Sequence, residues 1–297
     1  MPAIDTVPAE VDNWCCVVVL RSLPFNLLQD MKHTLLTLTI ASLLTINAFA
    51  DPIHNDAASD KLQRVLIFSK TAWYRHPALP EVNGFLVRLG AKHNIQMDVT
   101  ESPEDFSRLN NYQAIIFNST TDIGKTLNKQ QRKQLKDWYH AGGGIMALHA
   151  AAVHHNTWPW WTELLGCDFN SDSEFVKAKL IVDTKNKNHP AVKGFGPSFD
   201  YTADWTNHDK SVTGLSGVRV LLRIDEKSYD PARDAFKTRG GKPMGKDHPV
   251  SWIREFEGGR FFYTELGHEV KSLNTKFGHQ HLIEGLHWIT KCDSKNK

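Results

Sequence analysis

Short apolar runs alternate with amphipathic segments between residues 64 and 148, and this alternation constrains the fold more than any other feature of the chain. Each apolar run suits one buried strand, and each amphipathic segment carries hydrophobic residues at helical spacing. The predicted strands are 64–69, 95–100, 112–117 and 145–148. The predicted helices are 80–93, with Pro80 in its first turn, and 128–141, which the glycines at 142–144 end. This order predicts an α/β fold with a mostly parallel central sheet and helices on both faces.

The second half of the chain is richer in predicted strands and more irregular. Its predicted strands are 175–182, 218–224, 250–254 and 260–264, and 277–291 is expected to form a closing helix. The polar segment 226–247 is too long for a simple turn. We expect this segment to serve as a lid or as an arm in a homo-oligomer.

Residues 31–50 have the pattern of a secretory signal peptide. Lys32 gives a short basic start, an uncharged apolar run follows, and Ala48-Phe49-Ala50 provides the small residues of a cleavage site. The apolar run is too short for a membrane-spanning helix. We therefore expect an exported protein, periplasmic or secreted, without stable membrane insertion after cleavage.

The predicted signal peptide divides the chain into three parts. Residues 51–297 are expected to form a single domain, with its core at about 64–290. A secretory signal normally starts the chain, so we interpret residues 1–30 as an upstream extension and Met31 as the true start.

The charge balance argues against nucleic acid as a partner. The chain has 35 Lys and Arg against 33 Asp and Glu, a formal net charge of +2, so no strongly basic face is implied. The 15 histidines raise the question of acid–base or metal chemistry. Cys167 and Cys292 follow the leader, and in an exported protein they can be either free or bridged.

Polar residues follow three of the predicted parallel strands. In sheets of this class, ligands bind beyond the carboxyl ends of the strands. Here those ends are 69–76, 118–122 and 149–155. The side chains that we expect to bind substrate from these loops are Arg75, His76, Asp122, His154 and His155.

His149 ends the strongest local motif of the chain. The Gly-rich strand 142–148 runs into this histidine, and Ala150 and Ala151 follow it. A functional side chain between small residues at a strand end has the layout of a nucleophile elbow, although the residue here is neither Ser nor Cys. An imidazole in this place can accept a proton, donate one or bind a metal. A structural histidine in a tight turn is the alternative.

A second motif joins His268 to Glu269 at the end of the apolar strand 260–264. A carboxylate can fix the tautomer of a neighbouring histidine and stabilise its imidazolium. We therefore predict His149, His268 and Glu269 as catalytic residues. A histidine that caps a helix is the alternative for His268.

Three tryptophans follow the histidines of the third loop. Aromatic side chains present large apolar faces, which can pack on sugar rings while His154 and His155 meet sugar hydroxyls. Trp158 is therefore a candidate for substrate binding. We favour a place in the core for at least two of the three tryptophans, which are Trp158, Trp160 and Trp161.

The loop histidines are also candidate metal ligands. The sequence has neither His-Glu-x-x-His nor Cys-x-x-Cys, but loops can bring distant ligands together. We consider His76, His149 and His268 as ligands of a divalent ion such as zinc or manganese, and a site without any cofactor stays open. Asp204 is expected to bind substrate, to complete such a site or to act as an acid–base group.

Four segments together resemble the ThuA-like family, which is linked to trehalose utilisation. They are 69–76, 142–150, His189-Pro190, and 249–252 with 259–268. This family shares the flavodoxin-like, three-layer fold of the class I glutamine amidotransferases, so the resemblance implies that fold here. In glutamine amidotransferases the elbow residue is a cysteine, paired with a histidine that precedes a glutamate.

The resemblance also bears on the chemistry of the site. His149 holds the elbow position and His268-Glu269 the position of the pair, so the thiolate that attacks a glutamine amide is missing and glutaminase activity is not expected. Family members usually show Asp-Glu shortly before a Tyr in the central loop. Here Asp204 keeps the aspartate but the glutamate is absent, which leaves the substrate open.

Three functions remain possible for the chain, all with a small carbohydrate as partner. The first is an exported enzyme acting on a sugar or an oxidised (keto) sugar. His149 and His268 would move protons while Glu269 orients His268. A carbonyl acidifies neighbouring C–H bonds, so bases of histidine strength can drive elimination or isomerisation. The alternatives are a non-catalytic carbohydrate-binding protein and a metal-dependent hydrolase on the same scaffold.

Overall fold

The structure is a computed structural model that describes residues 63–290. The predicted signal peptide, the predicted upstream extension and Cys292 lie outside the described residues. Cys167 is fully buried. Among residues 63–290, no helix combines the length and the apolar character that a membrane crossing requires.

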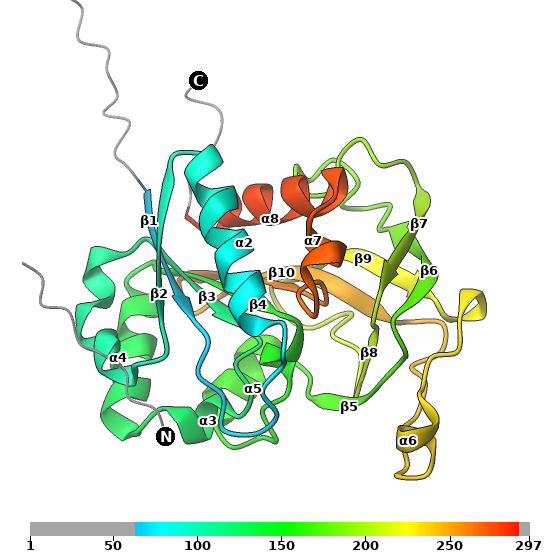
Figure 1. Ribbon diagram of the computed structural model, residues 1–297, viewed down its shortest axis with the longest axis horizontal. Helices are drawn as coiled ribbons and strands as arrows, with labels where there is room; N and C mark the ends of the chain where they lie inside the picture. The colour runs from blue at the N-terminus through cyan, green and yellow to red at the C-terminus, as the bar shows by residue number, and fades with distance from the viewer. Residues whose placement is uncertain (1–62, 291–297) are drawn as a thin grey trace, which may run out of the picture. The chain divides into compact units, whose positions relative to one another are not determined.

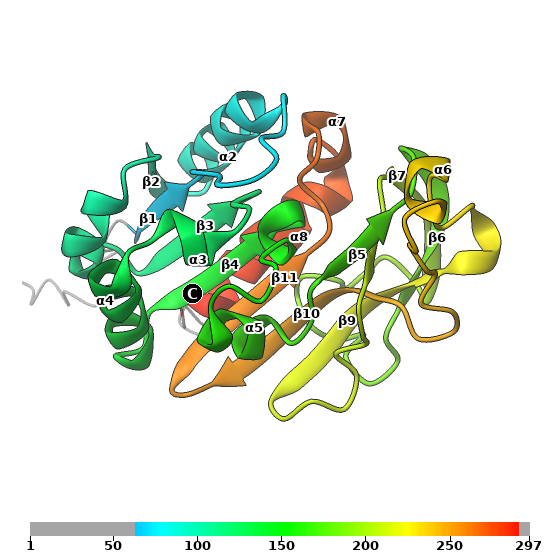
Figure 2. The same ribbon diagram turned by 90° about the horizontal axis from the view of Figure 1, so that it is seen from below.

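Within the described residues, nine strands form one sheet in the order β2-β1-β3-β4-β11-β10-β9-β6-β7 (Figure 2). A small separate sheet consists of β5 and β8, which are both labelled in Figure 1. The pairings from β2 to β11 are parallel, and those from β11 to β7 are antiparallel. The strands are β1 (Gln63–Phe68), β2 (Ile95–Thr100), β3 (Ala114–Asn118), β4 (Gly144–Leu148), β5 (Phe169–Asp172), β6 (Val176–Val182), β7 (Ser198–Ala203), β8 (Thr206–His208), β9 (Val218–Asp225), β10 (Pro249–Phe256) and β11 (Gly259–Thr264).

Helices cover both faces of the large sheet (Figure 1). The first face carries α2, α7 and α8, and the second carries η2, α3, α4 and α5. Their bounds are α2 (Leu79–Lys92), η2 (Pro103–Asn111), α3 (Ile123–Thr126), α4 (Lys129–His140), η3 (His149–Ala152), α5 (Pro159–Leu165), η4 (Glu226–Ser228), α6 (Asp234–Lys237), α7 (Val270–Leu273) and α8 (Lys276–Ile289).

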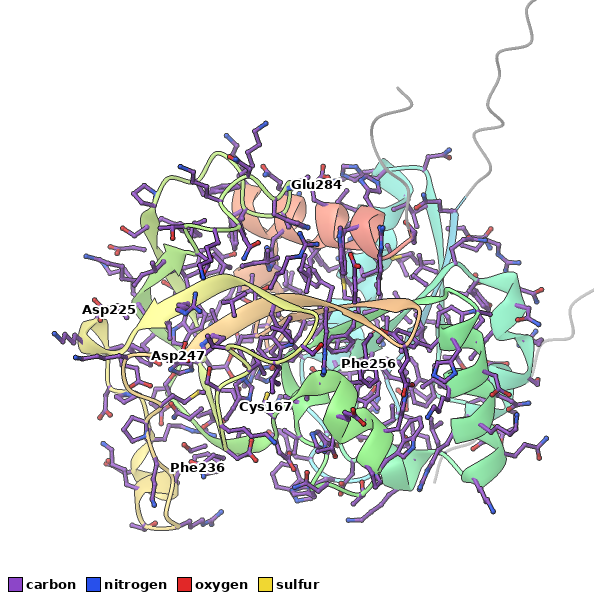
Figure 3. All side chains as sticks on the ribbon, turned by 180° about the vertical axis from the view of Figure 1, so that it is seen from behind. Cys167, Asp225, Phe236, Asp247, Phe256 and Glu284 are labelled. Carbon is purple, nitrogen blue, oxygen red and sulfur yellow. The ribbon has the colours of Figure 1, made fainter. Side chains whose placement is uncertain are left out.

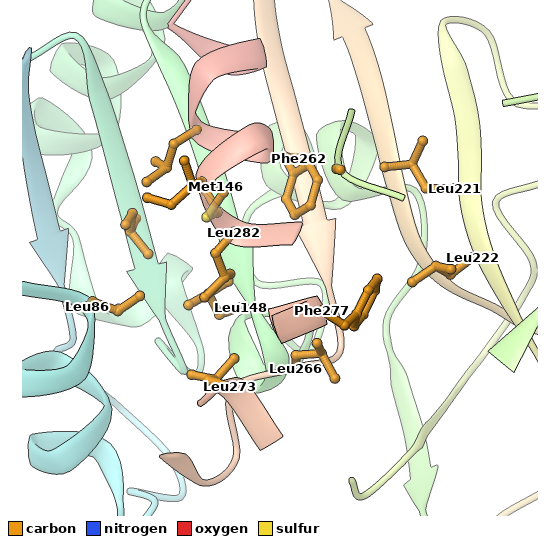
Figure 4. Close-up of a cluster of buried hydrophobic side chains, with 14 of the residues drawn as sticks. Leu86, Met146, Leu148, Leu221, Leu222, Phe262, Leu266, Leu273, Phe277 and Leu282 are labelled. Atoms are coloured by element: carbon orange, nitrogen blue, oxygen red, sulfur yellow. The ribbon is translucent and has the colours of Figure 1, made fainter. Parts of the chain in front are cut away.

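The period-two geometry of the strands divides the core into two clusters. In β3, Ile116 faces α2 and α8, whereas Ile115 and Phe117 face α4 and α5. Figure 4 shows the first cluster, in which Met146 of β4 and Phe262 of β11 pack against Leu282 of α8. Because both faces are buried, the central strands are apolar without interruption, which is why they are visible in the sequence.

The register aligns the carboxyl ends of the central strands. Leu148, the last residue of β4, pairs with Asn118 of β3 on one side and with Thr264 of β11 on the other. The loops that follow β1, β3, β4 and β11 therefore start at one edge of the sheet. This edge is where the sequence places most of its candidate residues.

The predicted α/β fold is confirmed, with a parallel half, a β-rich second half and helices in layers on both faces. The predicted helices 80–93 and 128–141 correspond to α2 and α4 within one residue at each end. Asn128 caps α4 through its side chain, in a capping box with Gln131. The patterns in the sequence do not predict the short elements η2, α3, η3, α5, η4, α6, α7, β5, β7 and β8.

The segment 226–247 between β9 and β10 is not without structure. It contains η4 and α6, and Figure 3 shows Asp225 and Asp247 at its two ends and Phe236 far from both. Arg233 attaches it to Asp172 of β5 through two hydrogen bonds, 2.6 Å from Nε and 2.8 Å from Nη2. The segment is therefore anchored to the small sheet.

Candidate functional site

His149 lies at the sharp turn that its motif predicts. It follows β4 directly, begins the short helix η3 and has a φ of 47°, a left-handed conformation that is uncommon for a residue with a side chain. Ala150 and Ala151 behind it are buried, and its own exposed fraction is 4%. Backbone strain of this kind persists where the surrounding structure enforces it.

Three histidines from three loops converge at this edge. Nε2 of His149 lies 3.1 Å from Nε2 of His76, which follows β1. The ring of His268, which follows β11, has its centroid 4.9 Å from those of His76 and His149. One nitrogen from each of the three lies within 4.8 Å of the others. The structure thus brings together residues that are up to 192 positions apart (268 − 76).

Asp204 is the carboxylate of this histidine cluster. It lies between β7 and β8, and its Oδ2 accepts a hydrogen bond from Nδ1 of His268 at 2.6 Å and lies 3.6 Å from Nε2 of His149. Its other oxygen, Oδ1, is buried without a hydrogen-bond partner among the described residues. Asp204 therefore fixes the tautomer of His268 and presents Nε2 of that ring to the cluster.

The prediction that Glu269 orients His268 needs correction. The Glu269 carboxylate lies 2.7 Å from Nζ of Lys271 and is partly exposed, while His268 bonds to Asp204. Extended backbone points neighbouring side chains to opposite sides, and Glu269 precedes α7 in extended conformation. Glu269 is adjacent to His268 in the sequence, but the hydrogen-bond partner of His268 is Asp204.

Two imidazoles of the cluster have pKa values that are shifted in opposite directions. Burial, reinforced by the nearby His149 and His268, lowers the pKa of His76 to about 2. Burial also acts to lower the pKa of His268, but its hydrogen bond to Asp204 and the charge of that carboxylate outweigh burial and raise it. Burial would raise the pKa of Asp204, yet the two histidines hold it below its usual value. A neutral and a readily protonated imidazole thus lie side by side.

A buried polar group behind His149 supports the elbow. The hydroxyl of Tyr263 donates to Oε1 of Glu265 at 2.6 Å and lies 3.1 Å from the carbonyl oxygen of His149. Glu265 in turn lies 2.9 Å from Nε2 of His208. The sequence motifs do not identify Tyr263 or Glu265 as site residues, although a carboxylate directly after an apolar strand is a usable signal.

Several predicted substrate-binding residues have other partners. Arg75 forms two hydrogen bonds with Glu101, at 3.0 and 2.7 Å. Asp122 is buried and pairs with Lys125 and His155. His155 remains 44% exposed, so it lies at the rim of the site.

His154 and Trp158 do not reach the histidine cluster. His154 is fully buried, and its Nε2 lies 2.8 Å from the carbonyl oxygen of Cys167. Trp158, Trp160 and Trp161 all belong to the core cluster on the second face of the sheet. Their faces are covered by other side chains, so the predicted sugar-stacking role of Trp158 is not available in this structure.

Two cavities differ in their relation to the cluster. A cavity of about 450 Å³ is lined by His268 together with Pro77, Ala78, Glu81 and residues 269–271. A larger one of about 620 Å³ lies at the end of α5, beside Gly166 and Arg254, and contains none of the clustered histidines. We assign the smaller cavity to the site because it opens onto a cluster residue.

The three histidines of the cluster could hold a divalent metal ion. Imidazole nitrogens are preferred ligands of zinc and of neighbouring transition metals, and three of them converge here. A carboxylate bonded to the second nitrogen of a ligating histidine is a recurrent outer partner, and Asp204 has that position toward His268.

Comparison with known proteins assigns the same scaffold. A family model described as "Trehalose utilisation" (ThuA) matches residues 64–289. A ThuA-like protein from Bacteroides uniformis is 22% identical, with a TM-score of 0.62 over 76% of this chain and 91% of that one. A ThuA-like protein from Parabacteroides merdae is 16% identical, with a TM-score of 0.57 over 80% and 93%. At these identities the structures show the fold alone, and no curated protein is significantly similar in sequence.

Proposed function

Because the chain belongs to the ThuA family of trehalose utilisation, we propose that it is a carbohydrate-processing enzyme with its catalytic centre at His76, His149, His268 and Asp204. The observation that carries this proposal is the convergence of three imidazoles beside one buried carboxylate. Structural histidines bond to backbone groups, as His154 does, and do not require one another. Titratable groups gathered at strand ends in this fold are typical of a reaction centre.

The pKa values of His76 and His268 shift in opposite directions, which favours different roles for the two imidazoles. His76, which burial keeps neutral and makes a weak base, is suited to hold the substrate through a hydrogen bond, and His268, supported by Asp204, is suited to donate a proton. His149, whose Nε2 lies 3.1 Å from Nε2 of His76, is the candidate that accepts a proton from the substrate. On a keto sugar, the base removes the proton of a carbon next to the carbonyl, and the acid protonates the carbonyl oxygen. Isomerisation is completed when the former carbonyl carbon takes up a proton and the hydroxyl on the adjacent carbon loses one, so that the carbonyl moves to that carbon. Elimination is completed when the β-substituent leaves with its bonding electrons and the enol hydroxyl loses its proton, so that the carbonyl forms again.

We further propose that the enzyme does not hydrolyse glutamine. His149 occupies the elbow where glutamine hydrolysis requires a thiolate. Burial raises the pKa of Cys167, which disfavours a thiolate there. Cys167 also packs in the core cluster of the second face, among tryptophan side chains.

The test is turnover by variants of the centre. We expect His149→Gln and His268→Gln each to lower kcat/KM by about 100-fold or more on the active substrate, because each removes a proton carrier. Intact disaccharides and their keto derivatives are the substrates to screen. His140→Gln, which changes a histidine on α4 paired with Glu257, is the matched control. Full turnover by both cluster variants would refute the assignment.

A second candidate, a metal-dependent hydrolase, is favoured by the same three ligand atoms. His76, His149 and His268 would hold the ion, which would supply a Lewis acid and an activated water. Elemental analysis of protein purified without a histidine tag distinguishes the candidates. One zinc, manganese or similar ion per chain, lost together with activity in His76→Gln, supports the hydrolase. A metal-free protein whose activity is indifferent to added metals and chelators contradicts it.

A further inference from the structure

Two large aromatic side chains are exposed next to the histidine cluster. Trp73 and Tyr74 are 53% and 50% exposed. Among residues 63–290, the other large hydrophobic side chains that are exposed are Val99 and Ile181. Single exposed hydrophobic residues need no explanation, but two consecutive aromatic residues on a loop of the site do.

The backbone beneath these aromatic residues is held in place. The buried residue Thr121 accepts a hydrogen bond from the backbone N–H of Ala72 at 3.1 Å through its carbonyl oxygen. Its hydroxyl lies 3.2 Å from the N–H of Trp73 and 3.1 Å from the carbonyl oxygen of Tyr74. The loop therefore presents both rings from a fixed backbone, which lowers the conformational entropy lost when a ligand binds.

The aromatic pair spans the rim from the cluster to His155. The ring of Tyr74 packs edge-on against His76, with centroids 4.8 Å apart. The ring of Trp73 packs edge-on against His155, with centroids 5.2 Å apart. Both contacts use the edge of one ring, and half of each aromatic surface stays open to solvent.

We propose that Trp73 and Tyr74 form a carbohydrate-stacking subsite that holds a sugar ring next to the ring that reacts. This inference rests on the proposed function and identifies the substrate as a neutral saccharide of at least two rings. A pyranose has apolar C–H faces that pack on aromatic rings, and hydroxyl edges that exposed polar groups can meet. His155 supplies such a group beside the ring of Trp73, and Arg75, which follows Tyr74 in the chain and pairs with Glu101, supplies another on the same loop.

The surroundings favour a sugar over other occupants. Two side chains are far fewer than a stable protein interface requires. Arg75, the cation next to the pair, is neutralised by Glu101, so no basic patch is offered to an anionic membrane surface. The same loop continues through Pro77 and Ala78 into the cavity at His268, which links the subsite to the catalytic centre.

Binding and turnover of trehalose, maltose, cellobiose and their keto derivatives test the proposal, on wild type, Trp73→Leu, Tyr74→Leu and Trp73→Phe. We expect the leucine variants to raise Kd and KM about tenfold with kcat unchanged, and Trp73→Phe to restore most of the affinity because it keeps an aromatic face. Ile181→Ala, an exposed apolar position on β6, is the control. Trp73 should also be protected from iodide quenching when the saccharide is bound.

The outcomes separate this inference from the proposed function. Unchanged Kd and KM in the leucine variants would overturn the subsite while turnover upholds the enzyme. Binding that depends on Trp73, with no turnover of any substrate, would uphold the subsite and overturn the enzyme. A change of oligomeric state by light scattering, with saccharide affinity unchanged, would identify a contact between copies and overturn the subsite. Failure of wild type to bind any of these saccharides would overturn both.

Discussion

The contact between Asp204 and His268 depends on tertiary structure. They lie 64 positions apart, and their 2.6 Å hydrogen bond joins the β7–β8 connection to the end of β11. The sequence predicted both residues as candidates, but it predicted Glu269 as the partner of His268. A pattern read along the chain favours neighbours, whereas hydrogen bonding depends on distance in space.

The buried histidine His281 is expected to make the stability of the fold depend on pH. It is fully buried in α8, its Nδ1 lies 3.0 Å from the carbonyl oxygen of Ala191, and burial lowers its pKa to about 4. A neutral buried histidine stabilises the fold above its unfolded pKa of about 6.5, and that contribution is lost as pH falls toward 4. We expect this residue alone to cost about 2 kcal/mol of unfolding free energy between pH 7.5 and pH 5.

Urea denaturation at pH 7.5 and pH 5 measures this loss. His281→Gln should show a smaller decrease between the two pH values than wild type, whatever its stability at pH 7.5. His287→Gln, on the same helix, controls for the change of residue type. An equal decrease in wild type and His281→Gln would show that His281 is not the group responsible.

At the scale of elements, the site depends on how closely β4 and β11 approach. Gly267 follows β11 with a φ of +141°, and a side chain built on it would meet Cβ of Leu148 at 3.2 Å and Cβ of His149 at 3.3 Å. The glycine thus allows the loop that carries His268 to pass directly over the elbow. Both histidines are placed by this one close approach.

We expect Gly267→Ala to destabilise the protein by about 1–3 kcal/mol and to lower kcat/KM, since it combines an unfavourable φ with pressure on His149. Gly194→Ala is the matched control, because Gly194 has a φ of +91° with no atom near its Cβ position. That variant should lose stability without losing activity. Equal activity losses in the two variants, measured alongside urea denaturation, would contradict the proposed contact.

At the scale of the whole described unit, the site lies where the two halves of the sheet meet. The parallel half supplies His76 and His149 from the ends of β1 and β4, and β11, its last strand, supplies His268. The antiparallel half supplies Asp204 from the end of β7. The complete site therefore needs residues from both halves of the sheet. The sequence patterns of one half alone do not predict it.

Export is the prediction that concerns the chain as a whole. We propose that residues 31–50 direct export and are removed, so that the mature protein is periplasmic or secreted and begins at Asp51. N-terminal sequencing of protein from the native host, after separation of cytoplasmic and exported fractions, checks both points. A protein that stays in the cytoplasm with residues 31–50 attached would refute export.

The amino-acid sequence by itself determined the class of fold and the place of the site. Central strands buried on both faces must be apolar throughout, and helices on a sheet must be amphipathic, so β1, β3, β4, α2 and α4 are visible as patterns. The parallel order then places the strand ends at one edge. Those two facts predicted His76 and His149 as candidates, and the His268-Glu269 motif after the strand 260–264 added His268.

The tertiary structure alone decided which candidates meet. Short elements such as β5, β7, β8 and α5 form because they pack on an existing sheet, so their sequences carry weak patterns of their own. Trp158 and His154 are buried in the core, whereas Trp73 and Tyr74 are exposed. Asp204 contacts His268 because β7 and β8, the short strands that flank Asp204, place it there. Side-chain partners depend on distances between segments remote in sequence, and these distances are fixed only when the whole domain packs.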